Sequence, residues 1–315
     1  MPKEFPCTLS LLASCYDVGF LEQTVRHVVR TCRYPFVERL LNIDLDSGSD
    51  DVLAELRKIC QRLIADAVID RVVEFDRTIG QDPRISSQYF GRSRIRRPRD
   101  HRNIPLFGWI SGIEACTSRY LLHFDCDILL YQQPGYSWID EGVRLLHRRG
   151  DIMSVAPHPG PPASDGLLHQ RATVEWKRDD GFLAFNSFTT RRYLIDTERF
   201  QAFLPIRLTH CPWKKRIRQW LRGKGTANTW ESHIKTALAD SRFCRADLDT
   251  SCAWTLHCKS RGKPFEDALP QIIEHIERGE FPEQQAGHYN LKLDLWQHGS
   301  ASNNGNENTD KVPLA

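Results

Sequence analysis

Short apolar runs alternate with segments of helical spacing in the first part of the chain. The runs "TLSLLASC" (8–15), "RLLNIDLD" (39–46) and "RVVEFD" (71–76) predict strands. Two helices are predicted between them, with apolar faces formed by Leu21, Val25, Val28, Val29 and Cys32 and by Leu53, Leu56, Cys60 and Leu63. Asp17 is the predicted N-cap of the first helix. This alternation is typical of an α/β fold with a mostly parallel central sheet flanked by helices.

A further apolar strand ends on two acids, in "RYLLHFDCD" (119–127), after a helix predicted over 104–117. Residues 77–103 show no clear element, and their arginine run from Arg92 to Arg102 predicts a flexible loop. The carboxyl ends of parallel strands line one crevice of an open sheet. We therefore expect Asp17, Asp46 and Asp125 to meet at one rim.

The second half is less regular in pattern. It contains a predicted loop "PHPGPP" (157–162), a basic amphipathic segment (213–222), a last helix (265–278) and a polar tail (299–315) expected to be disordered. We expect one main domain over 1–260, with a nucleotide-binding half (1–130) and an acceptor half (131–260). Residues 261–298 then form a C-terminal helical extension.

The charge balance, the cysteine spacing and the length of the apolar stretches limit the partners and the cellular location that the chain is expected to have. The 43 basic and 40 acidic residues leave a net charge of +3, so no global field calls for nucleic acid. The ten cysteines contain no CxxC pair, and the spacing of Cys252, His257 and Cys258 lacks a second half for a zinc site. No stretch reaches the about 18 apolar residues that span a bilayer. We expect a cytoplasmic protein, at most peripheral at a membrane, with buried thiols.

The Asp-x-Asp sequence formed by Asp125 and Asp127 suits a divalent cation. Two carboxylates one residue apart repel each other unless a cation or solvent lies between them. Hard oxygen ligands select Mg²⁺ or Mn²⁺, which keep coordination positions for phosphate oxygens. The pair therefore predicts a metal site that takes a diphosphate, although acidic turns after strands also occur without a metal.

The residues around this pair resemble family 2 glycosyltransferases of the GT-A fold. "GIEACTSRYLLHFDCD" is similar to the family stretch that leads into its metal site, with Gly112 thirteen residues before Asp125 and Ser118 in place of a second glycine. "SCYD" (14–17) and "DSGSDD" (46–51) resemble two earlier family landmarks. Trp109 and Ile110 depart from the family's Arg-Asn, so a donor contact is either lost or supplied by Arg102.

The resemblance implies a nucleotide-sugar donor, with a UDP-sugar expected, and a hydroxyl-bearing acceptor. Asp46 would lie near the base or ribose, the backbone of Ser14 to Tyr16 would frame the uridine, and Asp127 would be the main metal ligand beside Asp125. The predicted donor-binding residues are Ser14, Cys15, Tyr16, Asp17, Asp46, Gly112, Asp125 and Trp230. His257 is the third predicted metal ligand, with a satisfied histidine at a strand end as the alternative.

Glu231, in "NTWESHIKTAL", is the predicted general base. An inverting single displacement needs a group that takes the proton of the attacking hydroxyl, and the resemblance implies an acid at the start of a helix, after a tryptophan that could be a sugar platform. Alternatively, Glu231 only complements the helix dipole. A retaining transferase, a silent sugar-nucleotide-binding relative and a sugar-phosphate nucleotidyltransferase also stay open, although the last would need a glycine-rich basic loop after the first strand.

The basic segments have two interpretations each. The run from Arg92 to Arg102 is expected either to close over a diphosphate as a loop or to be a solvated run of charge. The second basic pair, Lys259 and Arg261, is expected either to neutralise a leaving diphosphate or to have no specific role. In 213–222, Trp213, Ile217, Trp220 and Leu221 share one helical face. This pattern has two interpretations. The helix either lies on an anionic membrane surface or packs its tryptophans on the domain as a lid over the acceptor.

Overall fold

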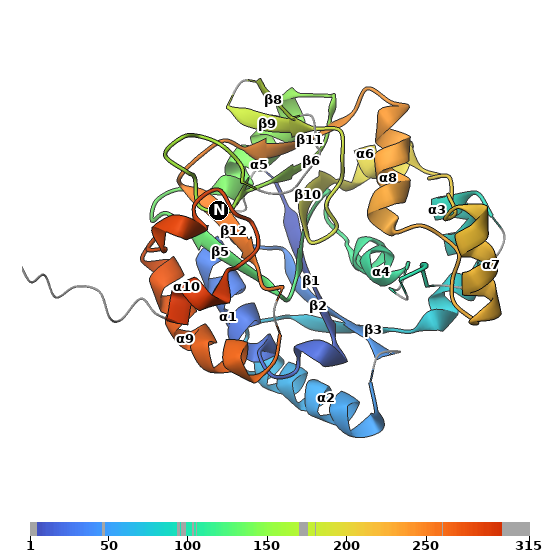
Figure 1. The fold of residues 1–315 in the computed structure, drawn as a ribbon, viewed down its shortest axis with the longest axis horizontal. Helices are drawn as coiled ribbons and strands as arrows, with labels where there is room; N and C mark the ends of the chain where they lie inside the picture. Colours follow the sequence, from blue (N-terminus) through green and yellow to red (C-terminus); the bar gives the residue numbers. More distant parts are fainter. Residues whose placement is uncertain are drawn as a thin grey trace, which may run out of the picture.

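The structure is a computed structural model that describes residues 5–45, 48–92, 95, 99–102, 104, 106–169, 176–179, 181–259 and 261–297. Figure 1 shows a central sheet with helices on both faces. The helices are α1 (Leu21–Cys32), α2 (Asp50–Ala65), α3 (Pro83–Phe90), α4 (Gly108–Ala115), α5 (Trp138–Arg148), α6 (Thr197–Phe203), α7 (Trp213–Leu221), α8 (Trp230–Ala239), α9 (Lys263–Glu277) and α10 (Leu293–Gln297), with 3-10 turns η1 (Cys15–Asp17), η3 (Arg77–Gln81) and η4 (Glu283–Gln285).

Two sheets organise the strands. The strands are β1 (Cys7–Ser14), β2 (Glu38–Asp44), β3 (Arg71–Phe75), β4 (Tyr120–Asp125), β5 (Ile128–Gln132), β6 (Ile152–Ala156), β7 (His158–Pro159), β8 (Trp176–Asp179), β9 (Phe182–Phe185), β10 (Arg192–Asp196), β11 (Cys244–Leu248) and β12 (Ala253–His257). The larger sheet has 9 strands in the order β3-β2-β1-β4-β10-β6-β11-β9-β8, and the smaller has 3 in the order β5-β12-β7. Among the described strands of the larger sheet, β10 and β9 alone oppose the direction of β1.

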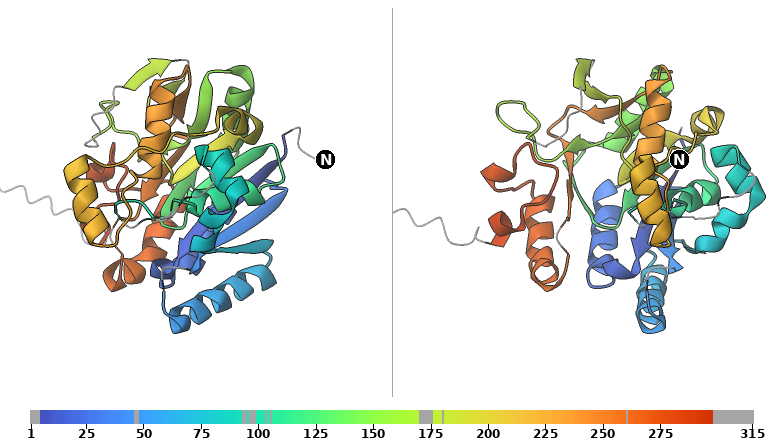
Figure 2. Two further views of the ribbon diagram at one scale, coloured as in Figure 1. Left: turned by 90° about the vertical axis from the view of Figure 1, so that its right-hand side faces the viewer. Right: turned by 45° about the vertical axis from the view of Figure 1, so that its right-hand side comes forward.

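Each face of the larger sheet has its own core. Residues of α1, α2 and α5 pack with Leu9 and Leu11 of β1 on one face. Residues of α3, α4, α6 and α8 pack with Leu121 of β4 on the other, and the two further views separate these layers (Figure 2). A parallel sheet covered on both faces needs strands that are apolar on both sides, which explains the near-continuous apolar runs in the sequence. The predicted α/β architecture is therefore confirmed.

The C-terminal helices pack on the smaller sheet. Phe265 and Leu269 of α9 pack with Trp254 and Leu256 of β12 in a third core, which also includes Phe20 before α1. This packing carries the chain after β12 back across the end of β1. Within the described residues, no helix combines the length and the apolar character needed to cross a bilayer.

Several local predictions were wrong. The N-cap of α1 is Phe20, because Asp17 lies in η1, where it accepts hydrogen bonds from Ser14. Residues 77–103 contain η3 and α3 rather than only a loop, and Asp82 caps α3 ahead of Pro83, a start signal that the arginine run obscured.

Other boundaries also differ. The predicted helix 104–117 is shorter, as α4 spans Gly108–Ala115. The loop "PHPGPP" contributes β7, which pairs with β12, and α10 follows the predicted last helix. The tail 299–315 and Asp46 lie outside the described residues.

Gly112 lets α4 approach β1 closely. A Cβ at this position would stand 2.4 Å from the Ser10 Oγ, and both residues are buried. Overpacking of this kind costs about 1–3 kcal/mol. We expect Gly112→Ala to lower the free energy of unfolding by that amount in urea denaturation.

Gly150→Ala is the matched control, because no described atom lies within 4 Å of the Cβ it would add and its backbone is not in the left-handed region. Equal stability of the two variants would show that α4 has room to shift at Gly112.

Candidate functional site

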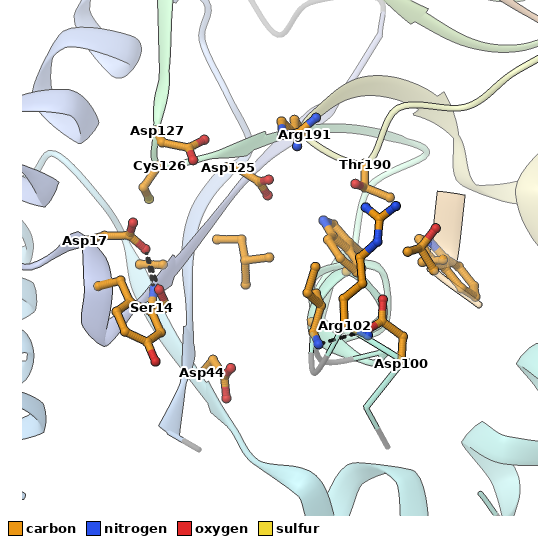
Figure 3. Close-up of a pocket in the computed structure, with 18 of the residues that line it drawn as sticks. Ser14, Asp17, Asp44, Asp100, Arg102, Asp125, Cys126, Asp127, Thr190 and Arg191 are labelled. Carbon is orange, nitrogen blue, oxygen red and sulfur yellow. Dashed lines mark hydrogen bonds between the residues drawn. The ribbon is translucent and has the colours of Figure 1, made fainter. Parts of the chain in front are cut away.

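One cavity of about 490 Å³ lies where the carboxyl ends of β1, β2 and β4 meet. Ser14 pairs with Asp44 and Leu12 with Asp125, so the parallel register brings these strand ends to one level. Thr190, Arg191 and the start of α8 form another wall, and a rim is contributed by Arg99, Asp100, Arg102 and Ile104. Figure 3 shows the acids at the strand ends facing Thr190 and Arg102 across the space. Asp17 and Asp125 meet at this cavity as predicted, together with Asp44, the last residue of β2, while Asp46 lies outside the described residues.

Arg261 joins two of these carboxylates. Its Nη1 lies 3.0 Å from Asp17 Oδ1, and its Nη2 donates to Asp127 Oδ2 at 2.6 Å. The His257 Nε2 lies 3.5 Å from the same Asp127 oxygen. The Ser14 N–H and hydroxyl both donate to Asp17 Oδ2, at 2.7 and 2.8 Å. One guanidinium thus ties the end of β1 to the turn after β4.

The two aspartates differ in electrostatics. Burial raises the pKa of Asp17 from 3.8 to about 6, against the opposing effects of Arg261 and Ser14. Burial alone would also raise the pKa of Asp127, but His257 and Arg261 outweigh it and lower that pKa. The lowered pKa keeps Asp127 ionised, whereas Asp17 titrates near pH 6.

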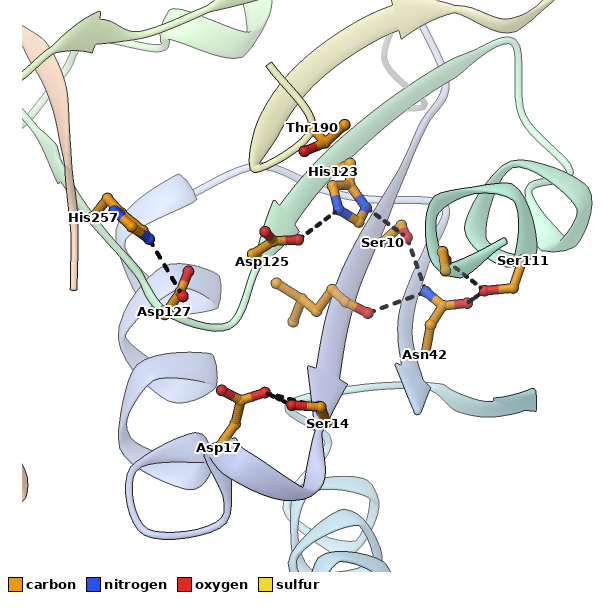
Figure 4. A network of polar contacts seen from close by, with 12 residues as sticks. Ser10, Ser14, Asp17, Asn42, Ser111, His123, Asp125, Asp127, Thr190 and His257 are labelled. Carbon is orange, nitrogen blue, oxygen red and sulfur yellow. Dashed lines mark hydrogen bonds and ion pairs between the residues drawn. The ribbon is translucent and has the colours of Figure 1, made fainter. Parts of the chain in front are cut away.

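A buried polar chain orients Asp125 (Figure 4). Its Oδ1 lies 3.3 Å from the His123 Nε2, and the His123 Nδ1 lies 3.3 Å from the Ser10 Oγ. The Asn42 amide donates to the same hydroxyl at 2.9 Å. The His123 ring also stacks on Tyr193, with centroids 4.7 Å apart. A ring fixed on both edges and one face holds the carboxylate at the rim of the cavity.

Glu231 is held from a separate direction. It lies in the first turn of α8, whose N-cap Thr229 accepts from the Ser232 N–H. The Thr190 N–H and hydroxyl donate to Glu231 Oε1 at 3.2 and 3.1 Å. Trp230 is 2% exposed and meets Phe90 edge to face, so most of its ring belongs to the core and only part lines the cavity.

Arg191 supplies half-buried positive charge beside these acids. Burial would lower its pKa, but Tyr289, Glu231 and the aspartates at 125 and 127 outweigh burial and raise it. With Arg261, it gives the cavity two cations fixed next to acidic groups. Such a pair suits an anionic ligand such as a diphosphate.

Asp127 and His257 are the side chains that could hold a divalent cation. Among the described residues, no cluster of three or more His, Cys, Asp and Glu side chains is arranged as a metal cage. Asp127 Oδ1 is nevertheless buried without a hydrogen-bond partner among the described residues, and His257 lies beside the other oxygen. One carboxylate and one imidazole fit an ion that completes its shell with phosphate oxygens and water.

The predicted residues divide into three groups. Ser14, Tyr16, Asp17, Asp125, Asp127, Trp230, Glu231 and His257 line the cavity. Cys15 and Gly112 are absent from its lining, and Gly112 packs against Ser10 inside the fold. Asp46 lies outside the described residues.

The sequence did not single out Asp44, Thr190 or Arg191, and it named Arg99 only as part of the run from Arg92 to Arg102. Asp44 could have been found, because "NIDLD" offers two acids at the strand end. Arg99 lies 3.8 Å from Asp44, a contact between segments far apart in the sequence that no local spacing predicts. Thr190 and Arg191 precede β10 without a motif, and only the fold brings them beside α8.

No protein-family model matches the sequence, and no curated protein matches it. Among solved structures, similarity is found to the galactosyltransferase LgtC in complex with donor and acceptor sugar analogues, with 10% identity, a TM-score of 0.42 and coverage of 85% of this chain and 95% of that chain. The mannosyltransferase PcManGT from Pyrobaculum calidifontis, in complex with GDP-Man and Mn²⁺, gives 9% identity, a TM-score of 0.44 and coverage of 96% and 71%.

A UDP-glucose pyrophosphorylase complexed with UDP-glucose gives 8% identity, a TM-score of 0.39 and coverage of 78% and 93%. At TM-scores this low, none of these likenesses assigns the chain a family or an activity. The chemistry therefore depends on the site's own residues.

The Arg261 bridge predicts a pH dependence of stability. The pKa of Asp17 is about 6 in the folded protein and 3.8 for an exposed aspartate, as in the unfolded chain. Protonation of Asp17 therefore contributes stability that is complete at low pH and is lost as the pH rises through about 6. Arg261→Met removes a favourable partner of the carboxylate, so the pKa of Asp17 rises further. We expect the variant to lose more stability than the parent between about pH 5 and about pH 8 in urea unfolding.

Arg57→Met is the control, since Arg57 pairs with Glu74 on the surface. A carboxyl-carbon NMR titration reports the pKa of Asp17 directly. An unchanged Asp17 pKa in Arg261→Met would contradict the bridge.

Proposed function

We propose that the protein is a glycosyltransferase that moves a sugar from a nucleoside-diphosphate sugar, a UDP-sugar in our assignment, to a hydroxyl acceptor. The observation that carries the proposal is a single cavity with the ionised Asp127 beside Arg261 on one wall and Glu231, fixed by Thr190, on another. The first wall supplies the charged groups that a metal-bound diphosphate needs, and the second supplies the carboxylate that a hydroxyl acceptor needs as a base. The proposed reaction is an inverting single displacement.

The donor would lie along the strand ends. The turn from Ser14 to Asp17 and the carboxylate of Asp44 line the part of the cavity that the uridine would occupy. Arg261 and Arg191 would then face the diphosphate. Donor binding would exchange part of the Arg261 contact with Asp17 and Asp127 for contacts with phosphate oxygens, which keeps a cation opposite each anion.

The divalent ion, Mg²⁺ or Mn²⁺, would be held by Asp127 and His257. When bound, it would stabilise negative charge on the leaving diphosphate as a Lewis acid. Asp125, fixed by the His123 chain, would orient the donor at the rim. Arg261 and Arg191 would add fixed positive charge without needing to reorganise.

Glu231 would remove the proton of the acceptor. The two Thr190 donors engage Oε1, so Oε2 is the oxygen assigned to the acceptor hydroxyl. As the acceptor oxygen bonds to the anomeric carbon, the bond from that carbon to the diphosphate breaks with its electron pair, and the proton passes to Glu231. Thr190 is a positioning residue, because it acts by fixing the orientation of this carboxylate.

The variant Glu231→Gln tests the base. The amide retains an oxygen for the Thr190 donors but cannot take a proton at neutral pH, so kcat should fall about 10²–10⁴-fold with little change in KM for the donor. Release of UDP from a panel of UDP-sugars with candidate hydroxyl acceptors measures both constants.

Glu55→Gln is the matched control, because the Glu55 side chain is half-exposed on α2 and its carboxylate pairs with Lys58 at the surface. A Glu231→Gln enzyme with the parental kcat would remove Glu231 from the role of base. Product analysis by NMR would separately identify the anomer, and retention would overturn the single displacement.

A further inference from the structure

Helix α7 presents its apolar face to solvent. Trp213, Ile217, Trp220 and Leu221 are 66%, 52%, 64% and 72% exposed, and no residue within α7 is buried. Their spacing of four, seven and eight residues from Trp213 places them in one stripe of the helix. Figure 1 places α7 at the margin of the molecule, away from the central sheet, and Figure 2 agrees. The tryptophans therefore do not pack on the domain as a lid.

The side of α7 turned to the protein is polar. Gln219 is the one residue of α7 that is half-buried, and its amide donates to the His101 carbonyl at 3.2 Å. At 100° per residue, Gln219 lies on the side of the helix opposite the middle of the apolar stripe. This arrangement inverts the usual one, in which a surface helix turns its apolar stripe to the core. Packing among the described residues therefore leaves the stripe uncovered.

Basic residues surround the stripe. Residues 210–225 contain Lys214, Lys215, Arg216, Arg218, Arg222 and Lys224 and no Asp or Glu. Lys214 and Arg216 flank the stripe on its two sides, and the whole chain has a net charge of only +3, so this segment is a local concentration of positive charge. Tryptophans with flanking cations match the interface of an anionic bilayer, where the rings enter the headgroup boundary and the long basic side chains remain at the headgroups.

The hairpin that carries α7 is attached to the rim of the cavity. Its two legs pair at His210 and Ala227, and the His101 N–H donates to the Ala227 carbonyl at 2.9 Å. A Cβ at Gly225 would stand 1.9 Å from the Arg99 carbonyl oxygen, so glycine allows the hairpin to lie directly on the rim. The second leg then continues into Thr229, Trp230 and Glu231, which line the cavity.

We propose that α7 docks the protein on an anionic lipid bilayer, with Trp213 and Trp220 in the headgroup region and the flanking cations on the lipid phosphates. The exposed aliphatic side chains of Ile217 and Leu221 favour lipid over nucleic acid, which would use the cations and the tryptophan rings but not these aliphatic groups. Docking would hold the rim next to Glu231 at the membrane. If the proposed function holds, the acceptor hydroxyl would be carried by a membrane-bound molecule, but the docking itself does not depend on that function.

The test is sedimentation of the full chain with vesicles, without substrate. Vesicles of phosphatidylcholine alone are compared with an equimolar mixture of phosphatidylcholine and phosphatidylserine. The protein should sediment with the mixed vesicles at least about tenfold more strongly, and high salt should weaken the binding. Trp213→Gln with Trp220→Gln, and separately Lys214→Glu with Arg218→Glu, should each lower the partition coefficient at least about tenfold.

Matched controls lie on α2, where Ile64→Gln replaces another exposed apolar residue and Lys58→Glu reverses another exposed cation. Both should bind as the parent does, and the α7 variants should keep the parental melting temperature because the replaced side chains are exposed.

Equal sedimentation on the two vesicle types would overturn the proposal, as would parental binding by the α7 variants. Self-association without vesicles that the tryptophan substitutions abolish would assign the stripe to a second copy and also overturn it. Because no turnover is measured, a failed transferase assay leaves this result intact.

Discussion

The ion pair of Arg261 with Asp17 and Asp127 is the interaction on which the site depends. Three parallel strands end at one level, and acidic groups at or just after their ends line one cavity. Carboxylates brought together in this way would be destabilising without compensation. Arg261 follows β12 and reaches back to both the turn after β1 and the turn after β4. The C-terminal part of the chain is therefore needed to complete a site built at the N-terminal strands.

This dependence explains how the two sheets are joined. β12 pairs with β5, which begins directly after Asp127, so His257 is held opposite the start of β5. The packing of α9 on β12 fixes the segment that carries Arg261. A cation that entered between Asp127 and His257 would meet an arrangement already set by these strands. The same arrangement leaves Asp127 Oδ1 without a hydrogen bond among the described residues, which is costly unless a ligand satisfies it.

The elements that the sequence predicts well are those whose pattern is local. The strand of residues 8–15 and the helix from Leu21 to Cys32 were found, because one face of β1, formed by Cys7, Leu9, Leu11 and Ala13, and one face of α1 are apolar. Asp125, Asp127 and Glu231 line the cavity and were named from the sequence, because each lies at or next to the end of an element with a recognisable pattern. Thr190 and Arg191 could not be found, since their role comes from β10 lying next to β4 in space. The Arg261 contacts belong to the same class, because they join residues more than a hundred positions apart.

Calorimetric titration of UDP into the protein, with and without Mn²⁺, tests the central claim that Asp127 and its neighbours form the seat of a metal-bound diphosphate. Mn²⁺ should tighten UDP binding by the parent at least about tenfold, and Asp127→Asn should abolish that gain while the variant stays folded. Asp267→Asn, an exposed residue of α9, should respond to Mn²⁺ as the parent does. UDP binding by the parent that is independent of Mn²⁺, or a full Mn²⁺ effect in Asp127→Asn, would contradict the account.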